Sequence, residues 1–159
     1  MSDAKTRAER LDGLRGRMVE AGLDLVALAP SDNLRYVLGF APVYDERACM
    51  LLVTPRSAAV LMPNLNAEQS AAEAPEIELV RWTDDAGPAD SLLRTLDRVG
   101  GAGARRAGVD PDMRAGHLLL LQAAIPDAGL VDASVAVRPI SFSHCRGIVM
   151  RSFSSRIWW

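Results

Sequence analysis

Few residues in this chain have the type and spacing that metal binding requires. The two histidines, His117 and His144, lie far apart, and neither an H-x-x-x-H nor a C-x-x-C spacing occurs. A structural zinc site needs closely spaced histidine or cysteine ligands, and hard cations need several converging carboxylates. We therefore expect no metal site in this sequence, and we interpret His117 as an exposed residue on a helix.

The sequence does not support nucleophilic catalysis either. No G-x-S-x-G motif is present, and the serines gather toward the C-terminus without a partnered base. The glycines of "GGAG" (100–103) follow a predicted helix and precede a predicted strand, the reverse of the order in dinucleotide-binding motifs. Cys49 lies in an apolar segment and is interpreted as a small core residue. The sequence therefore predicts no catalytic residue in this chain.

The residues that could recognise a ligand are concentrated between residues 33 and 47. In "NLRYVLGF" (33–40), the leucines and the valine would pack a short helix into the core, and Gly39 would supply a positive φ at its end. A polar loop directly before a core strand is where recognition groups are often found. Core packing does not explain why the segment contains Asn33, Arg35 and Tyr36, or why it is followed by the loop "APVYDER" (41–47).

The surrounding elements alternate between helices and strands. Apolar periodicity and boundary residues predict helices over 6–21, 32–38, 66–74, 88–99 and 111–125. Thr6 with Glu9 and Asn66 with Gln69 have the spacing of N-terminal capping pairs. Short apolar runs predict strands over 24–29, 48–54, 58–63, 77–82, 105–110 and 129–134.

The order of these elements predicts the fold class. The strands on either side of "PRS" (55–57) form an antiparallel hairpin, whereas the other strands alternate with helices. We therefore expect a three-layer α/β/α fold with a mixed sheet of roughly six strands.

Composition narrows the class of protein further. The chain has 159 residues, enough for one domain with a real core, and no apolar run approaches the ~20 residues of a membrane span. Two cysteines make no disulfide framework, which favours a cytoplasmic location. Residues 1–132 carry 14 basic and 20 acidic residues, so we expect neither a nucleic-acid partner nor a membrane partner.

The character of the sequence changes near residue 137. The segment "VRPISFSHCRGIVMRSFSSRIWW" (137–159) has no acidic residue and no helical or alternating period, and half of the eight aromatic residues lie beyond residue 140. We therefore place the domain at residues 1–137 and treat residues 138–159 as an atypical tail. A frameshift, a truncation or an engineered end would account for it.

One motif and the order of elements together resemble the N-terminal domain of the creatinase/prolidase (Xaa-Pro peptidase) family. Members show an Asn, then Tyr-Leu-Thr/Ser-Gly-Phe, then an Arg just before the next strand. Here these positions are Asn33, the run Tyr36-Val37-Leu38-Gly39-Phe40, and Arg47. The resemblance covers about residues 7–137, and Leu38 stands where the family usually has a small polar residue.

The resemblance implies a non-catalytic α/β unit with a ribonuclease-H-like sheet, which contributes to homodimer contacts and lies over the active site of a catalytic domain, often that of the neighbouring subunit. It implies that Tyr36, Phe40 and Arg47 are substrate-binding residues. In creatinases the corresponding arginine pairs with the substrate carboxylate, since a guanidinium can form two parallel hydrogen bonds to a carboxylate. Asp45 replaces a family aromatic residue, and pairing of Arg47 with Asp45 or Glu46 is the alternative interpretation.

The catalytic domain of this family binds two divalent metals, such as Mn, Co or Zn, through two Asp, one His and two Glu. This sequence lacks that ligand set, so the resemblance implies that the chain alone is inactive and that its parent is a metal-dependent hydrolase. Two alternatives stay open: a stand-alone dimerising interaction module, and a small-molecule-binding α/β domain that uses residues 41–47. Neither alternative includes enzyme activity.

Overall fold

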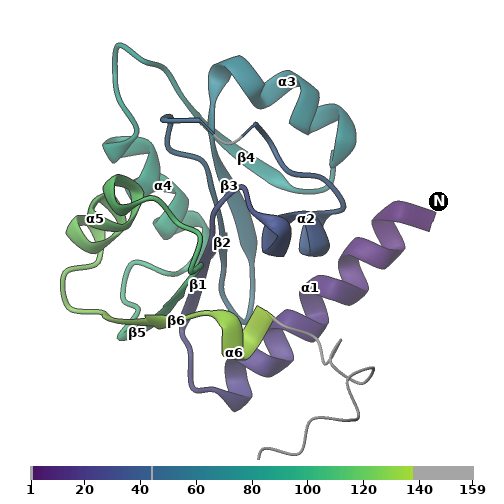
Figure 1. Ribbon diagram of the computed structural model, residues 1–159, viewed down its shortest axis with the longest axis vertical. Helices are drawn as coiled ribbons and strands as arrows, with labels where there is room; N and C mark the ends of the chain where they lie inside the picture. The colour runs from purple at the N-terminus through teal and green to yellow at the C-terminus, as the bar shows by residue number, and fades with distance from the viewer. Residues whose placement is uncertain (1, 44, 138–159) are drawn as a thin grey trace, which may run out of the picture.

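The computed structural model describes residues 2–43 and 45–137 of the chain (Figure 1). The helices of this part are α1 (Ser2–Glu20), α2 (Asp32–Leu38), α3 (Asn64–Glu73), α4 (Ala89–Val99), α5 (Ala115–Ala124) and α6 (Ser134–Val137). The strands are β1 (Leu25–Leu28), β2 (Met50–Val53), β3 (Ala58–Pro63), β4 (Glu78–Trp82), β5 (Arg106–Val109) and β6 (Gly129–Asp132). The predicted atypical tail, residues 138–159, lies outside the described residues.

A single mixed sheet organises the described part of the chain. Its six strands follow the order β4-β3-β2-β1-β5-β6. The strand β2 is antiparallel to both of its neighbours, β1 and β3, whereas the other neighbouring strands are parallel. The predicted mixed sheet and the predicted 48–54/58–63 hairpin are therefore confirmed.

Helices cover both faces of the sheet, because successive side chains of a strand point to opposite faces. In β1, Val26 and Leu28 join the core cluster under α1, α2, α3 and α6. Leu25 and Ala27 join the second cluster, under α4 and α5. All four residues of β1 are buried, as expected for a strand covered on both sides. The expected three-layer α/β/α class is confirmed.

Several helix boundaries differ from the sequence prediction. The helix α1 begins at Ser2, so Thr6 lies inside it and does not cap it. The helix α3 begins after Pro63 without a side-chain cap, so the predicted Asn66/Gln69 pair is wrong. The helix α5 begins at Ala115 instead of residue 111, because Asp110 first forms a turn that ends at Met113.

The short helix α2 has local signals at both ends. Ser31 Oγ accepts hydrogen bonds from the amides of Asn33 (3.2 Å) and Leu34 (3.5 Å), which have no partner inside the helix. At the other end Gly39 has a φ of 82°, a left-handed conformation that glycine adopts without strain. The position of this helix in the sequence was therefore predictable from its caps.

Asp110 attaches α2 to the end of β5. Its side chain is buried, and its Oδ2 accepts a hydrogen bond of 2.6 Å from Ser31 Oγ. Its Oδ1 accepts hydrogen bonds of 3.1 Å each from Asn33 Nδ2 and the Asp112 amide. Asn33, which packing alone did not explain in the sequence, thus links two elements that lie 77 positions apart.

The substitution Asp110→Ala should lower the free energy of unfolding by about 2–4 kcal/mol, because it leaves partly buried donors of Ser31 and Asn33 without their acceptor. Urea denaturation monitored by circular dichroism measures this change. Asp97→Ala, at an exposed position of α4, is the control and should change the same free energy by less than about 0.5 kcal/mol. Equal effects of the two substitutions would contradict the structural role of Asp110.

Candidate functional site

The direction of β2 decides which residues meet at one edge of the sheet. The strands β1, β4 and β5 all run in one direction, and β2 runs against them. The residues that lead into β2 therefore lie at the edge where the parallel strands end. In open α/β sheets, ligands bind preferentially at this carboxyl edge.

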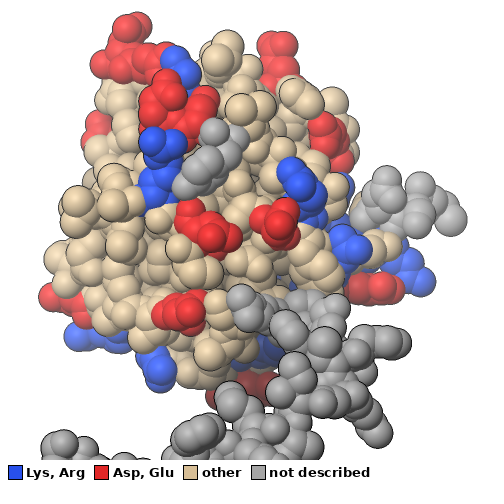
Figure 2. Space-filling view, viewed as in Figure 1, with Lys and Arg blue, Asp and Glu red and all other residues tan. Residues whose placement is uncertain are grey.

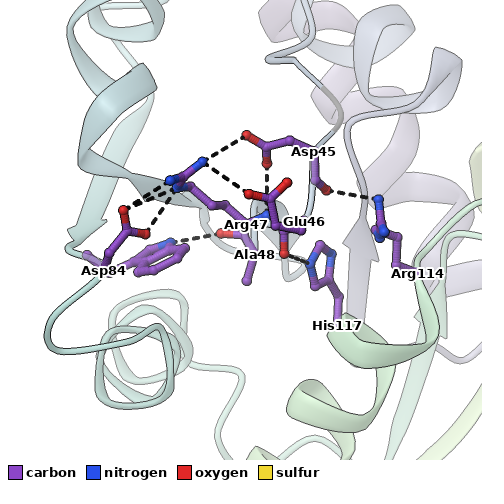
Figure 3. Close-up of polar contacts among 8 residues, drawn as sticks. Asp45, Glu46, Arg47, Ala48, Asp84, Arg114 and His117 are labelled. Atoms are coloured by element: carbon purple, nitrogen blue, oxygen red, sulfur yellow. Dashed lines mark hydrogen bonds and ion pairs between the residues drawn. The ribbon is translucent and has the colours of Figure 1, made fainter.

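Arg47, just before β2, forms a two-pronged contact with Asp84, just after β4. Its Nε lies 3.0 Å from Asp84 Oδ1, and its Nη2 lies 3.1 Å from Asp84 Oδ2. Its Nη1 lies 3.4 Å from Glu46 Oε1 and 3.7 Å from Asp45 Oδ2. Figure 3 shows the guanidinium turned toward Asp84. Sequence reasoning missed Asp84, because only the sheet order brings it beside Arg47.

This pairing changes the acidity of both groups. The hydrogen bond from Arg47, aided by its charge, lowers the pKa of the Asp84 carboxyl below its ordinary value of 3.8. The same hydrogen bond raises the pKa of the Arg47 guanidinium. Both groups therefore stay charged at neutral pH.

Two side chains from α5 and its N-terminal flank hold the loop that carries Arg47. Arg114 Nη1 donates to the Asp45 carbonyl at 3.3 Å, and His117 Nε2 lies 3.2 Å from the Glu46 carbonyl (Figure 3). Since a carbonyl only accepts, His117 Nε2 must carry the proton. The loop is thereby fixed from α5 on one side and from Asp84 on the other.

His117 corrects the sequence prediction of an exposed histidine. It is only 7% exposed, because the 45–48 segment lies across this part of α5. Its Nδ1 is buried and has no hydrogen-bond partner among the described residues. The sequence gave no signal for this burial, since the four consecutive leucines at 118–121 lie around the whole helix and mark no single buried side.

A cavity of ≈450 Å³ adjoins Arg47. Its apolar part includes Trp82, whose Nε1 donates to the Ala48 carbonyl at 2.8 Å and so fixes the indole. Its charged rim consists of Arg47, Glu46 and Asp84. The arrangement can hold a small molecule that has an apolar body and a charged group.

Tyr36 and Phe40 lie elsewhere. The Arg10 guanidinium stacks over the Tyr36 ring, 4.8 Å from its centroid, and Arg10 Nη1 donates to the Tyr36 carbonyl at 2.7 Å. Phe40 is half-buried and lines a different cavity of ≈480 Å³ between α1, α2 and α3. The structure therefore places these two residues on the α1/α2 side of the sheet, away from the Arg47 cavity next to α4 and α5.

The described residues offer no ligand set for the family's metal pair. No group of three or more His, Cys, Asp or Glu within residues 2–43 and 45–137 could hold a metal ion. Burial raises the pKa of the Cys49 thiol to about 12, so this side chain stays protonated and is a poor metal ligand. Nor is any described helix both long and apolar enough to span a membrane.

Comparison with known proteins identifies the family. The model of the creatinase/prolidase N-terminal domain matches residues 10–140. This chain belongs to the creatinase/prolidase N-terminal domain family. The match includes Arg47, Asp84 and the α5 residues that hold the loop. No curated protein shows significant similarity to the chain.

Solved structures agree with this assignment. Dipeptidase PepE from Mycobacterium ulcerans has a TM-score of 0.75 and 26% identity, over 87% of this chain and 37% of that protein. The creatinase/prolidase N-terminal domain of an X-Pro dipeptidase from Streptococcus pyogenes has a TM-score of 0.70 and 17% identity, over 78% of this chain and 92% of that domain. Prolidase from Thermococcus sibiricus has a TM-score of 0.72 and 22% identity, over 86% of this chain and 36% of that protein. This chain thus spans little more than a third of the length of the two longer relatives.

Replacing Asp84 by Asn should lower the free energy of unfolding at neutral pH but not in acid. The pKa of Asp84 is lower in the native state than in the unfolded state. The stability that its carboxylate contributes is therefore present above the unfolded-state pKa and is lost as the pH falls through the native-state pKa. Urea denaturation of both proteins between about pH 3 and pH 7 should show the difference in unfolding free energy shrinking toward acid. A difference independent of pH would contradict the Arg47–Asp84 pairing. Asp85→Asn, at the neighbouring exposed position of the same turn, is the matched control.

Proposed function

We propose that this chain acts as the non-catalytic N-terminal domain of a metal-dependent hydrolase that cleaves Xaa-Pro peptides. The observation that carries the proposal is the difference in coverage. The chain matches 92% of an isolated N-terminal domain from an X-Pro dipeptidase, but only 37% of a longer dipeptidase. The Mn, Co or Zn pair of such an enzyme would be bound by the catalytic domain, which corresponds to the part of the relatives that this chain does not match.

The proposed role of the domain is to cover the active site and to contribute contacts between subunits. Support comes from the rigid placement of polar groups at the carboxyl edge of the sheet. The Arg47 loop is held by His117, Arg114 and Asp84, so a substrate approaching it would meet a preformed surface. Such a surface orients a substrate without taking part in bond cleavage.

Arg47 is the residue that we propose meets the carboxylate of the substrate. In the structure, the Nε and Nη2 donors of its guanidinium are occupied by Asp84, which is exposed at the rim of the cavity. A substrate carboxylate of the same geometry would compete with Asp84 for these two donors. Tyr36 and Phe40, which the resemblance also implies as substrate-binding residues, lie on the α1/α2 side and would meet a substrate apart from the Arg47 cavity.

Purified 1–159 protein should release no proline from alanyl-proline, whether or not Mn, Co or Zn is added. The physical reason is that the described residues provide no set of ligands for a metal pair. Proline release measured by chromatography tests this directly, with a full-length prolidase as the positive control. Hydrolysis that depends on added metal and stops with a chelator would overturn the non-catalytic assignment.

A second candidate, a small-molecule-binding domain, is favoured by the ≈450 Å³ cavity, which lies in the usual size range of ligand pockets. Its charged rim and fixed Trp82 suit a small zwitterion such as a dipeptide.

If this second candidate is correct, alanyl-proline at about ten times its dissociation constant should raise the melting temperature by about 3–5 °C. Arg47→Ala should abolish this rise, because the cation at the rim is lost. Arg56→Ala, at an exposed arginine in the turn between β2 and β3, is the matched control and should leave it unchanged. No rise in the wild type, or an equal rise in both variants, would reject the second candidate.

A further inference from the structure

Arg47 is surrounded by more negative charge than its guanidinium neutralises. Asp84 accepts from its Nε and Nη2 at 3.0 and 3.1 Å, and its Nη1 lies 3.4 Å from Glu46 Oε1 and 3.7 Å from Asp45 Oδ2. Figure 3 shows Asp84 on one side of the guanidinium and the other two residues toward the opposite side. The carboxylates outnumber the guanidinium three to one, and Arg114, at the Asp45 carbonyl, offsets only part of this excess.

Asp84 is the more exposed member of the pair that it forms with Arg47. Its side chain is 67% exposed in the turn after β4, whereas that of Arg47 is 29% exposed and follows a segment that α5 holds through His117. Figure 2 shows charged side chains of both signs gathered over the turn after β4 and the segment before β2, at the upper left of the view. A ligand that opens the pair would therefore move Asp84 and leave Arg47 in place.

The net charge of a ligand decides how easily it can open this pair. A ligand with only a carboxylate would take the Nε and Nη2 donors of Arg47, but it would leave Asp84 without a partner and add to the negative excess. A ligand that also has an ammonium group adds no net charge, and its ammonium can pair with the displaced Asp84 carboxylate. The site should therefore prefer a zwitterion to a simple acid.

The space around the pair suits a short peptide. The ≈450 Å³ cavity has Trp82 as an apolar wall, and both Arg47 and Asp84 line it. Two extended residues span about 7 Å, so the two charged ends of a dipeptide can reach groups on the same rim. A second cavity of ≈230 Å³ is lined by the same three residues, so a displaced Asp84 side chain has open space beside it.

We propose that Asp84 determines the specificity of this site by exchanging its partner, Arg47, for the ammonium group of a zwitterionic peptide. This inference rests on the proposed function, in which Arg47 meets the carboxylate of the substrate, and it adds the group that recognises the opposite charge. The ligand class is a short peptide with both a free amino group and a free carboxylate.

Three peptides separate the two charges. Alanyl-proline has both, acetyl-alanyl-proline has only the carboxylate, and alanyl-prolinamide has only the ammonium. NMR titration of the Trp82 indole N–H resonance, assigned with Trp82→Phe, measures each dissociation constant at the cavity itself. Alanyl-proline should bind the wild-type chain about five- to tenfold more tightly than either of the other two.

Variants of the pair assign each preference to one residue. Asp84→Asn should remove the preference for the free amino group and keep that for the free carboxylate. Acetyl-alanyl-proline should bind this variant more tightly than it binds the wild type, because the internal competitor for Arg47 is absent. Asp84→Glu should restore the preference for the amino group, and Arg47→Ala should remove only the preference for the carboxylate. Asp85→Asn, at the neighbouring exposed position of the turn, is the matched control and should bind all three peptides like the wild type.

The possible results separate this inference from the proposed function. If Arg47→Ala removes the carboxylate preference but Asp84→Asn keeps the amino-group preference, the role of Asp84 is wrong and that of Arg47 stands. If Glu46→Gln removes the amino-group preference in place of Asp84→Asn, the assignment to Asp84 is overturned as well. If no peptide shifts the Trp82 resonance, both the Arg47 contact and the Asp84 exchange are overturned, whereas the non-catalytic assignment is decided separately by the proline-release assay. Melting temperatures well above the titration temperature verify that every variant is folded.

Discussion

The reversal of β2 is the constraint on which the candidate site depends. A strand parallel to its neighbours would have left residues 45–47 at the opposite edge of the sheet, far from the ends of β4 and β5. Because β2 is antiparallel to β1 and β3, its N-terminal flank lies where the other strands end. Arg47, Asp84 and the beginning of α5 thus meet at one edge although they are widely separated in the sequence.

The contacts around Arg47 hold its side chain in one position, so its charge is not freely mobile. An exposed arginine with no partner would have many conformers, and a ligand would have to restrict them at a cost in entropy. Here the two carboxylate oxygens of Asp84 accept hydrogen bonds from one edge of the guanidinium, and the Asp45 carboxylate accepts from the Arg47 amide at 2.9 Å. The charge is therefore fixed in position, and a carboxylate ligand would exchange with Asp84 instead of ordering a mobile side chain.

The two faces of the sheet have different surroundings. On one face, α1 joins neighbouring elements through buried Arg7, which donates to the Leu38 carbonyl at 2.6 Å and to the Glu73 carbonyl at 3.0 Å and pairs with Glu76. On the other face, α4 is amphipathic and packs its apolar side inward, whereas α5 carries four consecutive leucines and leaves one of them, Leu119, exposed. The Arg47 cavity also involves α5, since His117 and Leu120 line it.

The sequence alone determined the elements whose signals are local. Buried runs such as 24–29 predicted strands covered on both faces, Gly39 marked the end of α2, and "PRS" marked the hairpin, because strand burial, left-handed φ and turn geometry are properties of neighbouring residues. The motif from Asn33 to Arg47, together with the order of the helices and strands, was also sufficient to suggest the family. The proposed tail boundary near residue 137 stays a prediction.

Only the tertiary structure decided which distant residues meet. It paired Arg47 with Asp84, buried His117 against the Glu46 carbonyl, and used Asn33 to bind Asp110. None of these contacts has a signature in local periodicity, since each depends on the order and direction of strands that are joined across the sheet. The same is true of the leucines of α5: their sequence predicts packing, but the packing of the whole domain decides that Leu121 is buried and Leu119 is exposed.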